Sequence, residues 1–326
     1  MKDKGIIYDL TVIVVTYNSS WEKLRRTLNS ILYQKKVKIE LIIADDGSKN
    51  NWFRETTEYI GNSIKVLLLP SEQNMGTVKN IYRAALKASA PYIKTISPGD
   101  YFYSEYTVYK WLKYIVFNNS KVSFGRAVYY SSQDGKINII NKENKPRLLK
   151  PYHSSKRDNI GEKINYLLCD DYILGATLIY ETNILIKYLS RICGKVRYAE
   201  DSILRLMFLD DIKINFFDCA VIWYEYGTGI SNNNSSKAQN AMLFDWKATN
   251  RIIANWRRTD WFTNRIRLLY KIMEQNSYLA KPVKIVLFPS YIFWKVYGNI
   301  FRECTISNTE WRFYTMISRE MKMLCR

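Results

Sequence analysis

Apolar and polar positions alternate most regularly over the first hundred residues of the chain. Residues 10–15 are a continuous apolar run rich in β-branched side chains, which is typical of a buried parallel strand. Residues 21–32 carry apolar side chains at helical spacing, and residues 39–44 form a second apolar run. This order predicts a β-α-β unit, whose crossover is almost always right-handed.

The same patterns predict the elements downstream. The expected strands are residues 64–69, 92–96, 122–130, 137–140, 175–180 and 214–223. The expected helices are residues 50–60, 77–90, 104–118 (capped by Ser104) and 203–209. Residues 142–159 are polar and basic and predict a mobile loop, and helical periodicity replaces strand signals from about residue 238. We therefore expect an α/β domain at residues 1–236 and a basic, aromatic helical region at residues 237–326.

Polar side chains follow three of the predicted strands at the point where each strand ends. Ligands of open α/β sheets bind outside the carboxyl ends of the strands, so these side chains are candidate ligand contacts. They are Thr16, Tyr17, Asn18, Asp45, Asp46, Ser97 and Asp100. Asn74 and Gly76 can turn the chain into the following helix, so that backbone N–H groups and Lys79 face the same site.

The charge of the chain predicts an anionic partner. Its 326 residues include 49 basic and 30 acidic ones, a net charge of +19, which suits nucleotide phosphates, nucleic acid or an anionic membrane surface. Residues 247–326 alone hold 15 basic and 5 acidic residues. The five cysteines are scattered without C-x-x-C spacing, which favours reduced thiols in a cytoplasmic protein. The longest late apolar run, residues 285–294, is about half a membrane span, so we expect no transmembrane helix.

Taken together, these marks resemble a family 2 glycosyltransferase of the GT-A fold, the inverting kind that builds bacterial surface polysaccharides. The resemblance covers residues 10 to about 235. It is carried by the two strand ends at residues 16–18 and 44–48, the helix entrance at 74–80, the strand ending at Asp100, and Glu200-Asp201 at a helix start. It implies a Rossmann-like mixed sheet flanked by helices, with the helical C-terminal region as an extension.

The resemblance also implies roles for individual residues. Tyr17 would stack on the nucleotide base, Asp46 would accept the N–H of the base, and Lys79 would lie near the diphosphate. Asp100 would hold Mg²⁺ or Mn²⁺, and Asp201 would be the catalytic base. A loop that closes over the donor falls on Gly227, Thr228, Gly229 and Ser231.

One departure from the family pattern concerns the metal site. The family signature supplies two or three carboxylates, whereas Ser97 and Gly99 stand at the other places here and only Asp100 remains. A hard cation can still bind one carboxylate together with phosphate oxygens and water. We therefore expect weak metal affinity without donor, and metal independence stays open.

Structural interpretations of the same residues also stay open. Asp45 and Asp46 could form a plain turn, Asp100 could cap a turn, and Glu200 and Asp201 could be first-turn acids favoured by the helix dipole. Asp170 and Asp171 could line an acceptor pocket or lie in a solvated turn. The C-terminal region could pack on the core, or present an apolar face flanked by Lys281, Lys284 and Lys295 to an anionic bilayer.

The resulting hypothesis is an inverting transferase that moves a hexosyl or N-acetylhexosaminyl group from a UDP-sugar to a glycan hydroxyl. The resemblance implies an acceptor linked to undecaprenyl diphosphate, in O-antigen or capsule synthesis, and a protein peripheral to the inner face of the plasma membrane. A catalytically weak, membrane-docking member of the fold is one alternative. A basic nucleic-acid-binding protein is the other, although no recognised module appears and no nucleic acid is expected as partner.

Overall fold

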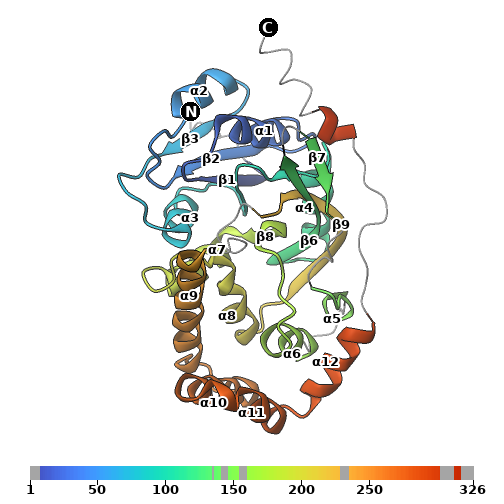
Figure 1. Ribbon diagram of the computed structural model, residues 1–326. Coiled ribbons are helices and arrows are strands. Elements are labelled where there is room, and N and C mark those ends of the chain that lie inside the picture. The colour runs from blue at the N-terminus through green and yellow to red at the C-terminus, as the bar shows by residue number, and fades with distance from the viewer. Residues whose placement is uncertain are drawn as a thin grey trace, which may run out of the picture.

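The computed structural model describes residues 8–133, 136–140, 146–153, 160–227, 235–301 and 312–316. Within these residues, nine strands form one mixed sheet that occupies the upper half of the molecule in Figure 1. The strands are β1 (Leu10–Thr16), β2 (Ile39–Asp45), β3 (Val66–Leu69), β4 (Tyr92–Ile96), β5 (Tyr101–Phe102), β6 (Val122–Gln133), β7 (Lys136–Ile139), β8 (Leu178–Glu181) and β9 (Ile214–Glu225).

The N-terminal part of the sheet is parallel, as its sequence predicts. The order is β3-β2-β1-β4, and β1 pairs with β2 from Leu10↔Ile39 to Thr16↔Asp45. Helix α1 (Trp21–Leu32) makes the crossover from β1 to β2. Because both strands lie inside the sheet and are covered on both faces, nearly all of their side chains are buried, which explains their continuous apolar runs.

The second part of the sheet is mixed. Strand β8 pairs antiparallel with both β4 and β6, β9 runs parallel to β6, and β5 closes the edge antiparallel to β9. Strand β7 pairs antiparallel with β6, as a hairpin predicts, while its turn residues Asp134 and Gly135 lie outside the described residues. The topology turns the carboxyl ends of β1, β2 and β4 toward one edge of the sheet.

Helices cover both faces of the sheet. Their bounds are α1 (Trp21–Leu32), α2 (Phe53–Ile60), α3 (Thr77–Ala85), α4 (Thr107–Phe117), α5 (Lys150–His153), α6 (Ile160–Leu168), α7 (Thr182–Ile192), α8 (Ile203–Leu209), α9 (Ser236–Ala254), α10 (Trp261–Gln275), α11 (Ala280–Leu287) and α12 (Ser290–Ile300). One apolar core contains α1 and α4, and the other contains α3, α7, α8 and α10.

Three local predictions are wrong. The sequence pattern did not indicate α6 or α7, and α5 lies within the range predicted as a loop because Pro151 and Tyr152 are buried there. Ser104 does not cap α4, which begins at Thr107 after Tyr106. Its backbone N–H instead donates to the Thr107 hydroxyl over 2.8 Å.

The C-terminal helices continue the larger core. Figure 1 shows α9 descending from the sheet and α10 to α12 forming an arc beneath it. Ile253, Phe262, Ile266, Leu269 and Phe288 share a buried cluster with α7 and α8. Helix α9 begins at Ser236. Among the described helices, none combines the length and the apolar character needed to cross a membrane.

We predict that α10 unfolds together with the sheet domain. Ile266 is fully buried in the shared core, so Ile266→Ala should lower the free energy of unfolding by about 2–5 kcal/mol in a single transition, measured by chemical denaturation. Leu268 on the same helix is 47% exposed, so Leu268→Ala is the matched control and should change it by less than about 0.5 kcal/mol. Two separate transitions in the wild-type protein would contradict the prediction.

Candidate functional site

A cleft of about 630 Å³ opens at the carboxyl ends of β1, β2 and β4, and we call it the central cleft. It collects side chains from segments that lie far apart in the sequence. Of the sequence-predicted site residues, the structure places the following in its wall: Thr16, Tyr17, Asn18, Asp46, Asn74, Ser97, Asp100, Glu200 and Asp201. Tyr17 is 51% exposed, so the face of its ring is open to a ligand.

The carboxylate of Asp46 fixes the start of α3. Its two oxygens accept the backbone N–H groups of Met75 and Gly76 over 2.7 and 2.9 Å. Gly76 has φ +89°, and a Cβ there would lie 2.6 Å from the carbonyl oxygen of Arg197, so only glycine fits. Arg197 also donates to the Asn74 side chain over 3.0 Å. The entrance of α3 is therefore clamped between the end of β2 and the segment around Arg197.

Asp45 is not in the wall of the central cleft. Its oxygens accept from the Thr16 hydroxyl over 2.8 Å, from the Ser48 hydroxyl over 2.6 Å and from the backbone N–H groups of Gly47 and Ser48. Asn18 has φ +49° and receives the Lys49 N–H over 3.0 Å. These bonds make Asp45 a turn-forming residue that shapes the ligand edge.

Asp100 is buried at the base of the central cleft beside two residues that sequence reasoning missed. Its Oδ1 accepts the backbone N–H of Glu225 over 3.1 Å, and the Glu225 carboxylate pairs with the Lys23 ammonium at 2.6 Å. Burial raises the pKa of Asp100 to about 7, while the Glu225 N–H and the nearby Lys94 and Lys23 ammonium groups lower it. Asp100 therefore binds a proton, or a cation, more readily than an exposed aspartate does.

Lys94 is a fully buried lysine beneath the same cleft. It lies on β4, and its ammonium donates to the carbonyl oxygens of Thr95 and Ala176 over 2.6 and 2.7 Å. Burial lowers its pKa to about 7, against the charges of Asp100 and Glu200, which raise it. A lysine in the middle of the short apolar strand 92–96 was the sequence signal for this buried cation.

Glu200 and Asp201 form the opposite wall in the turn η2 (Glu200–Ser202), which leads into α8. A Cβ added to Gly175 would lie 3.4 Å from the Asp201 Cβ and 3.4 Å from Glu200 Oε1, so both side chains lie against that glycine. Burial raises the pKa of both carboxyls, and the Asp201 charge raises the Glu200 pKa further. A backbone N–H and the Arg205 guanidinium lower the Asp201 pKa, so Asp201 is the member of the pair that ionises first.

Asp245 on α9 holds the segment that carries this acidic pair. It is fully buried, and its carboxylate accepts the backbone N–H groups of Arg197, Tyr198 and Ala199 over 2.8, 2.6 and 3.0 Å. Met242, one turn earlier on α9, lines the central cleft. Sequence reasoning missed Asp245 because its partners are backbone groups almost fifty residues away.

Other predicted site residues lie elsewhere. Lys79 is exposed on α3 and is not in the wall of the central cleft. Asp170 is exposed near Lys284, and Asp171 is buried, where it accepts the backbone N–H groups of Arg147 and Leu148. Gly227 lies in a turn after β9, while Thr228, Gly229 and Ser231 fall outside the described residues.

Comparison with known proteins identifies the class. Residues 11–171 match the family model described as glycosyl transferase family 2, and no curated protein sequence matches the chain. This match places residues 11–171 in family 2 of the glycosyltransferases, and the mixed sheet with its cleft has the GT-A fold.

Solved structures share this fold at low sequence identity. TarS from S. aureus matches with a TM-score of 0.53 and 18% identity over 88% of this chain, which spans 49% of the TarS chain. TarS 1–349 in complex with UDP-GlcNAc matches with a TM-score of 0.55 and 17% identity, covering 97% of this chain and 92% of that one. The mannosyltransferase PcManGT from Pyrobaculum calidifontis, in complex with GDP-Man and Mn²⁺, matches with a TM-score of 0.51 and 10% identity. The match covers 91% of this chain and 86% of that one.

We predict that Asp245→Asn lowers glycosyltransferase activity without unfolding the protein. An amide nitrogen cannot accept the N–H bonds that one carboxylate oxygen accepts. Their loss should lower the free energy of unfolding by about 1–3 kcal/mol and loosen the segment carrying Glu200 and Asp201. Steady-state kinetics should therefore show a lower kcat, with thermal unfolding still cooperative. Asp218→Asn, at an exposed ion pair, is the control and should keep the wild-type kcat. An Asp245→Asn variant with unchanged kcat would show that the anchor is dispensable.

Proposed function

We propose that this glycosyltransferase moves a sugar from a UDP-sugar to a hydroxyl of a glycan acceptor, with inversion at the anomeric carbon. The observation that carries the proposal is the convergence of Asp46, Asp100 and Asp201 on one cleft whose volume suits a nucleotide-sugar. TarS 1–349 in complex with UDP-GlcNAc has the same fold, which supports UDP as the nucleotide and a hexosyl or N-acetylhexosaminyl group as the sugar.

The nucleotide half of the donor would lie between Tyr17 and Asp46. The exposed ring of Tyr17 can stack on a base, and Asp46 retains lone pairs for a base N–H besides the two backbone bonds that it accepts. The bonds from the start of α3 fix the orientation of the Asp46 carboxylate. It therefore favours a base that presents an N–H in that direction.

Asp201 is the residue we propose as general base. The acceptor oxygen attacks the anomeric carbon as the bond from that carbon to the diphosphate oxygen breaks, and the hydroxyl proton passes to the Asp201 carboxylate. Arg205 and a backbone N–H favour the ionised form of Asp201, whereas Glu200 holds a proton more readily. The pair thus supplies one ionised carboxylate, which is what proton removal requires.

Negative charge on the leaving diphosphate needs cations near Asp100. Among the described residues, no group of three or more His, Cys, Asp or Glu side chains is placed to hold a metal ion. The Glu225 carboxylate lies against Gly99, but it pairs with Lys23 and is not in the wall of the central cleft, so Asp100 is the carboxylate that faces the donor. Asp100 would hold Mg²⁺ or Mn²⁺ together with phosphate oxygens and water, and such an ion would stabilise the charge that develops on the diphosphate.

The acceptor is proposed to be a lipid-linked glycan of a bacterial surface polysaccharide, such as O-antigen or capsule. Exposed apolar side chains on α11 and α12, among them Val286, Phe293 and Ile300, support contact with a membrane surface. Lys281, beside them on α11, is exposed and would favour anionic lipid.

The first test is transfer with the purified protein and a panel of UDP-sugars. Hydrolysis or transfer from a UDP-sugar, with GDP-mannose inactive, is the expected result. Asp201→Asn should then lower kcat about 10²–10⁴-fold with little change in the KM for donor, because the base acts only in the transition state. An Asp201→Asn variant with wild-type kcat would contradict the assignment.

Glu200→Gln is the matched control for Asp201→Asn. It keeps the ionised base, so the loss of kcat should be much smaller. Because burial raises the Asp201 pKa, kcat/KM should fall on acidification at a pH above the ordinary aspartate range near about 3.9. Because Glu200 still holds its proton where Asp201 titrates, Glu200→Gln should leave this acid limb at its wild-type pH.

We predict that metal ions bind only together with nucleotide. Mn²⁺ alone should leave the melting temperature unchanged. UDP together with Mn²⁺ should give a higher melting temperature than UDP alone. A ligand at a hundred times its Kd adds about 2.7 kcal/mol to the free energy of unfolding. Asp100→Asn should remove the increment due to Mn²⁺. Asp170→Asn, outside the central cleft, is the control and should retain it. An increment that survives in Asp100→Asn would place the metal elsewhere.

A further inference from the structure

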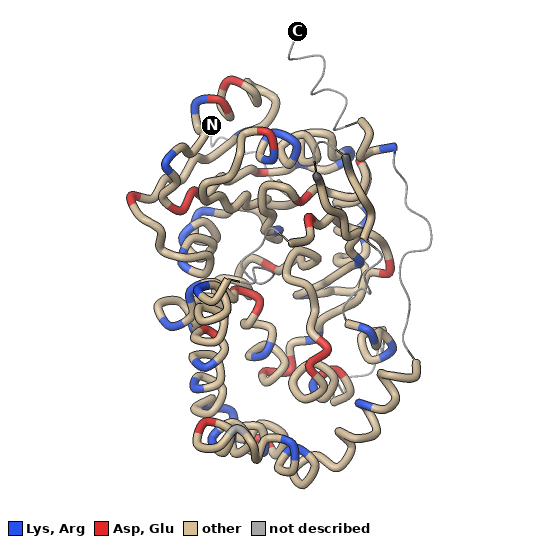
Figure 2. The backbone as a smooth tube through the Cα atoms, viewed as in Figure 1, with Lys and Arg blue, Asp and Glu red and all other residues tan. Residues whose placement is uncertain are grey.

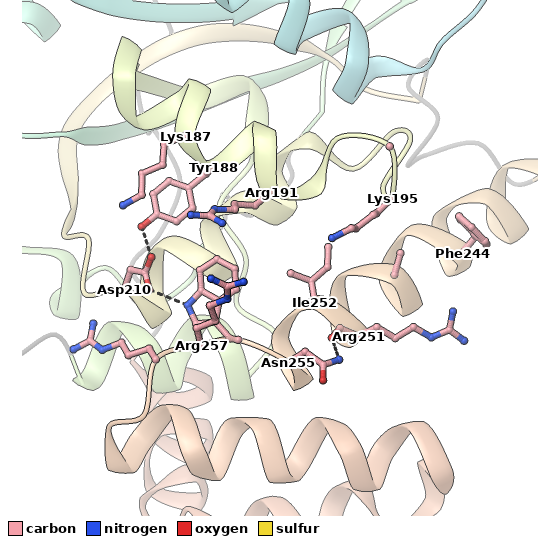
Figure 3. Close-up of a pocket in the computed structure, with 14 residues that line it drawn as sticks. Lys187, Tyr188, Arg191, Lys195, Asp210, Phe244, Arg251, Ile252, Asn255 and Arg257 are labelled. Carbon is pink, nitrogen blue, oxygen red and sulfur yellow. Dashed lines mark hydrogen bonds between the residues drawn. The ribbon is translucent and has the colours of Figure 1, made fainter.

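A second pocket is lined by Gly194 and Lys195, a few residues before Glu200 and Asp201 in the chain. We call it the basic pocket; its volume is about 710 Å³, and α7, the turn at residues 194–195, α9 and the turn at residues 255–258 form its walls (Figure 3). Its cations are Lys187, Arg191, Lys195, Arg251, Arg257 and Arg258, and its one carboxylate is Asp210. None of these residues belongs to the central cleft.

Most of these cations have no carboxylate partner within the described part of the chain. Arg251 pairs with Glu274, and Arg258 pairs with Asp260 and Asp211. Among the described residues, Arg191, Lys195 and Arg257 have no ion-pair partner, and the Lys187 ammonium lies over the Tyr188 ring at 5.2 Å. The pocket therefore concentrates uncompensated positive charge, which an anionic ligand would relieve.

The single carboxylate of the basic pocket is already bound. Asp210 accepts the Tyr188 hydroxyl over 2.8 Å through one oxygen and the Trp256 indole N–H over 2.8 Å through the other (Figure 3). These bonds tie α7 to the turn after α9 and stiffen the back of the pocket. Because both donors are neutral, Asp210 keeps its negative charge, which offsets only one of the six cations that line the pocket.

The pocket combines this charge with an apolar wall. Ile252 and Ala248 on α9 and the Trp256 ring lie among the cations. Figure 3 shows Lys187, Arg191 and Lys195 along one side of the space, with Arg251 and Arg257 on the other. Figure 2 shows further basic positions along α9. Cations that converge on a hollow from two sides suit a compact polyvalent anion, since guanidinium groups bind phosphate oxygens in pairs.

We propose that the basic pocket is a binding site for a phosphate-type anion, separate from the nucleotide-sugar site. The ligand is a phosphomonoester, phosphodiester or diphosphate group, carried either by a soluble phosphorylated molecule or by a lipid headgroup. Its attached apolar or ring-bearing part packs on Ile252 and Trp256. Helix α9 and residues 194–201 each line both the basic pocket and the central cleft, so a molecule bound here lies next to the wall that holds Asp201.

The test is calorimetric titration of the full chain with inorganic pyrophosphate in the presence of EDTA, which suppresses metal-dependent binding in the central cleft. The double variant Arg191→Ala/Lys195→Ala removes two unpaired cations from exposed positions of the pocket. Lys65→Ala/Lys87→Ala is the matched control, since it removes two exposed cations elsewhere. We expect one site per chain, at least tenfold weaker in the pocket variant and unchanged in the control.

Vesicle binding distinguishes the two sources of the anion. The same three proteins are mixed with phosphatidylglycerol vesicles and with phosphatidylcholine vesicles, and co-sedimentation is measured. Pyrophosphate binding that depends on Arg191 and Lys195 supports a soluble phosphorylated ligand. Dependence seen only with phosphatidylglycerol supports a lipid headgroup. If the pocket variant and the control variant behave alike with both probes, the positive charge acts only as a general surface field and the proposal is wrong.

Discussion

Backbone N–H groups held by buried carboxylates determine the shape of this site. Asp46 fixes the start of α3, and Asp245 fixes residues 197–199, so charge-assisted bonds position the two walls of the central cleft in addition to apolar packing. Asp245 comes from the C-terminal helices, which share the larger core with α7 and α8. The arrangement of the acidic pair therefore depends on parts of the chain that lie beyond the family 2 match at residues 11–171.

The acidic residues of the central cleft share one electrostatic environment. Lys94 is buried beneath the cleft, and its charge acts on both Asp100 and Glu200, while Lys23 pairs with Glu225 next to Asp100. Removing any one of these charges changes the protonation of the others, because the surroundings are poorly solvated. The site consequently behaves as a set of coupled groups.

Sequence patterns predicted the parallel half of the sheet well. Strands β1, β2 and β4 came from continuous apolar runs, and the residues following them, Tyr17, Asp46 and Asp100, do line one cleft. Sequence patterns could not predict the long-range partners, because Asp245, Glu225 and Lys94 act on groups that only tertiary folding brings close. Lys79 was expected beside the ligand site from the turn at the helix entrance, but its side chain is exposed on α3 and is not in the wall of the central cleft. Helices α6 and α7 were not predicted, because the elements packed against them determine which of their faces is buried.

The close contact between Gly76 and Arg197 constrains how this enzyme can evolve. The backbone of Arg197 fills the space that any side chain at position 76 would need, and its carbonyl accepts the N–H of Val78 over 3.0 Å. A relative that carries a larger residue at position 76 must also have displaced the chain around position 197, and with it the acidic pair. The two positions should therefore change together across the family, although more than a hundred residues separate them.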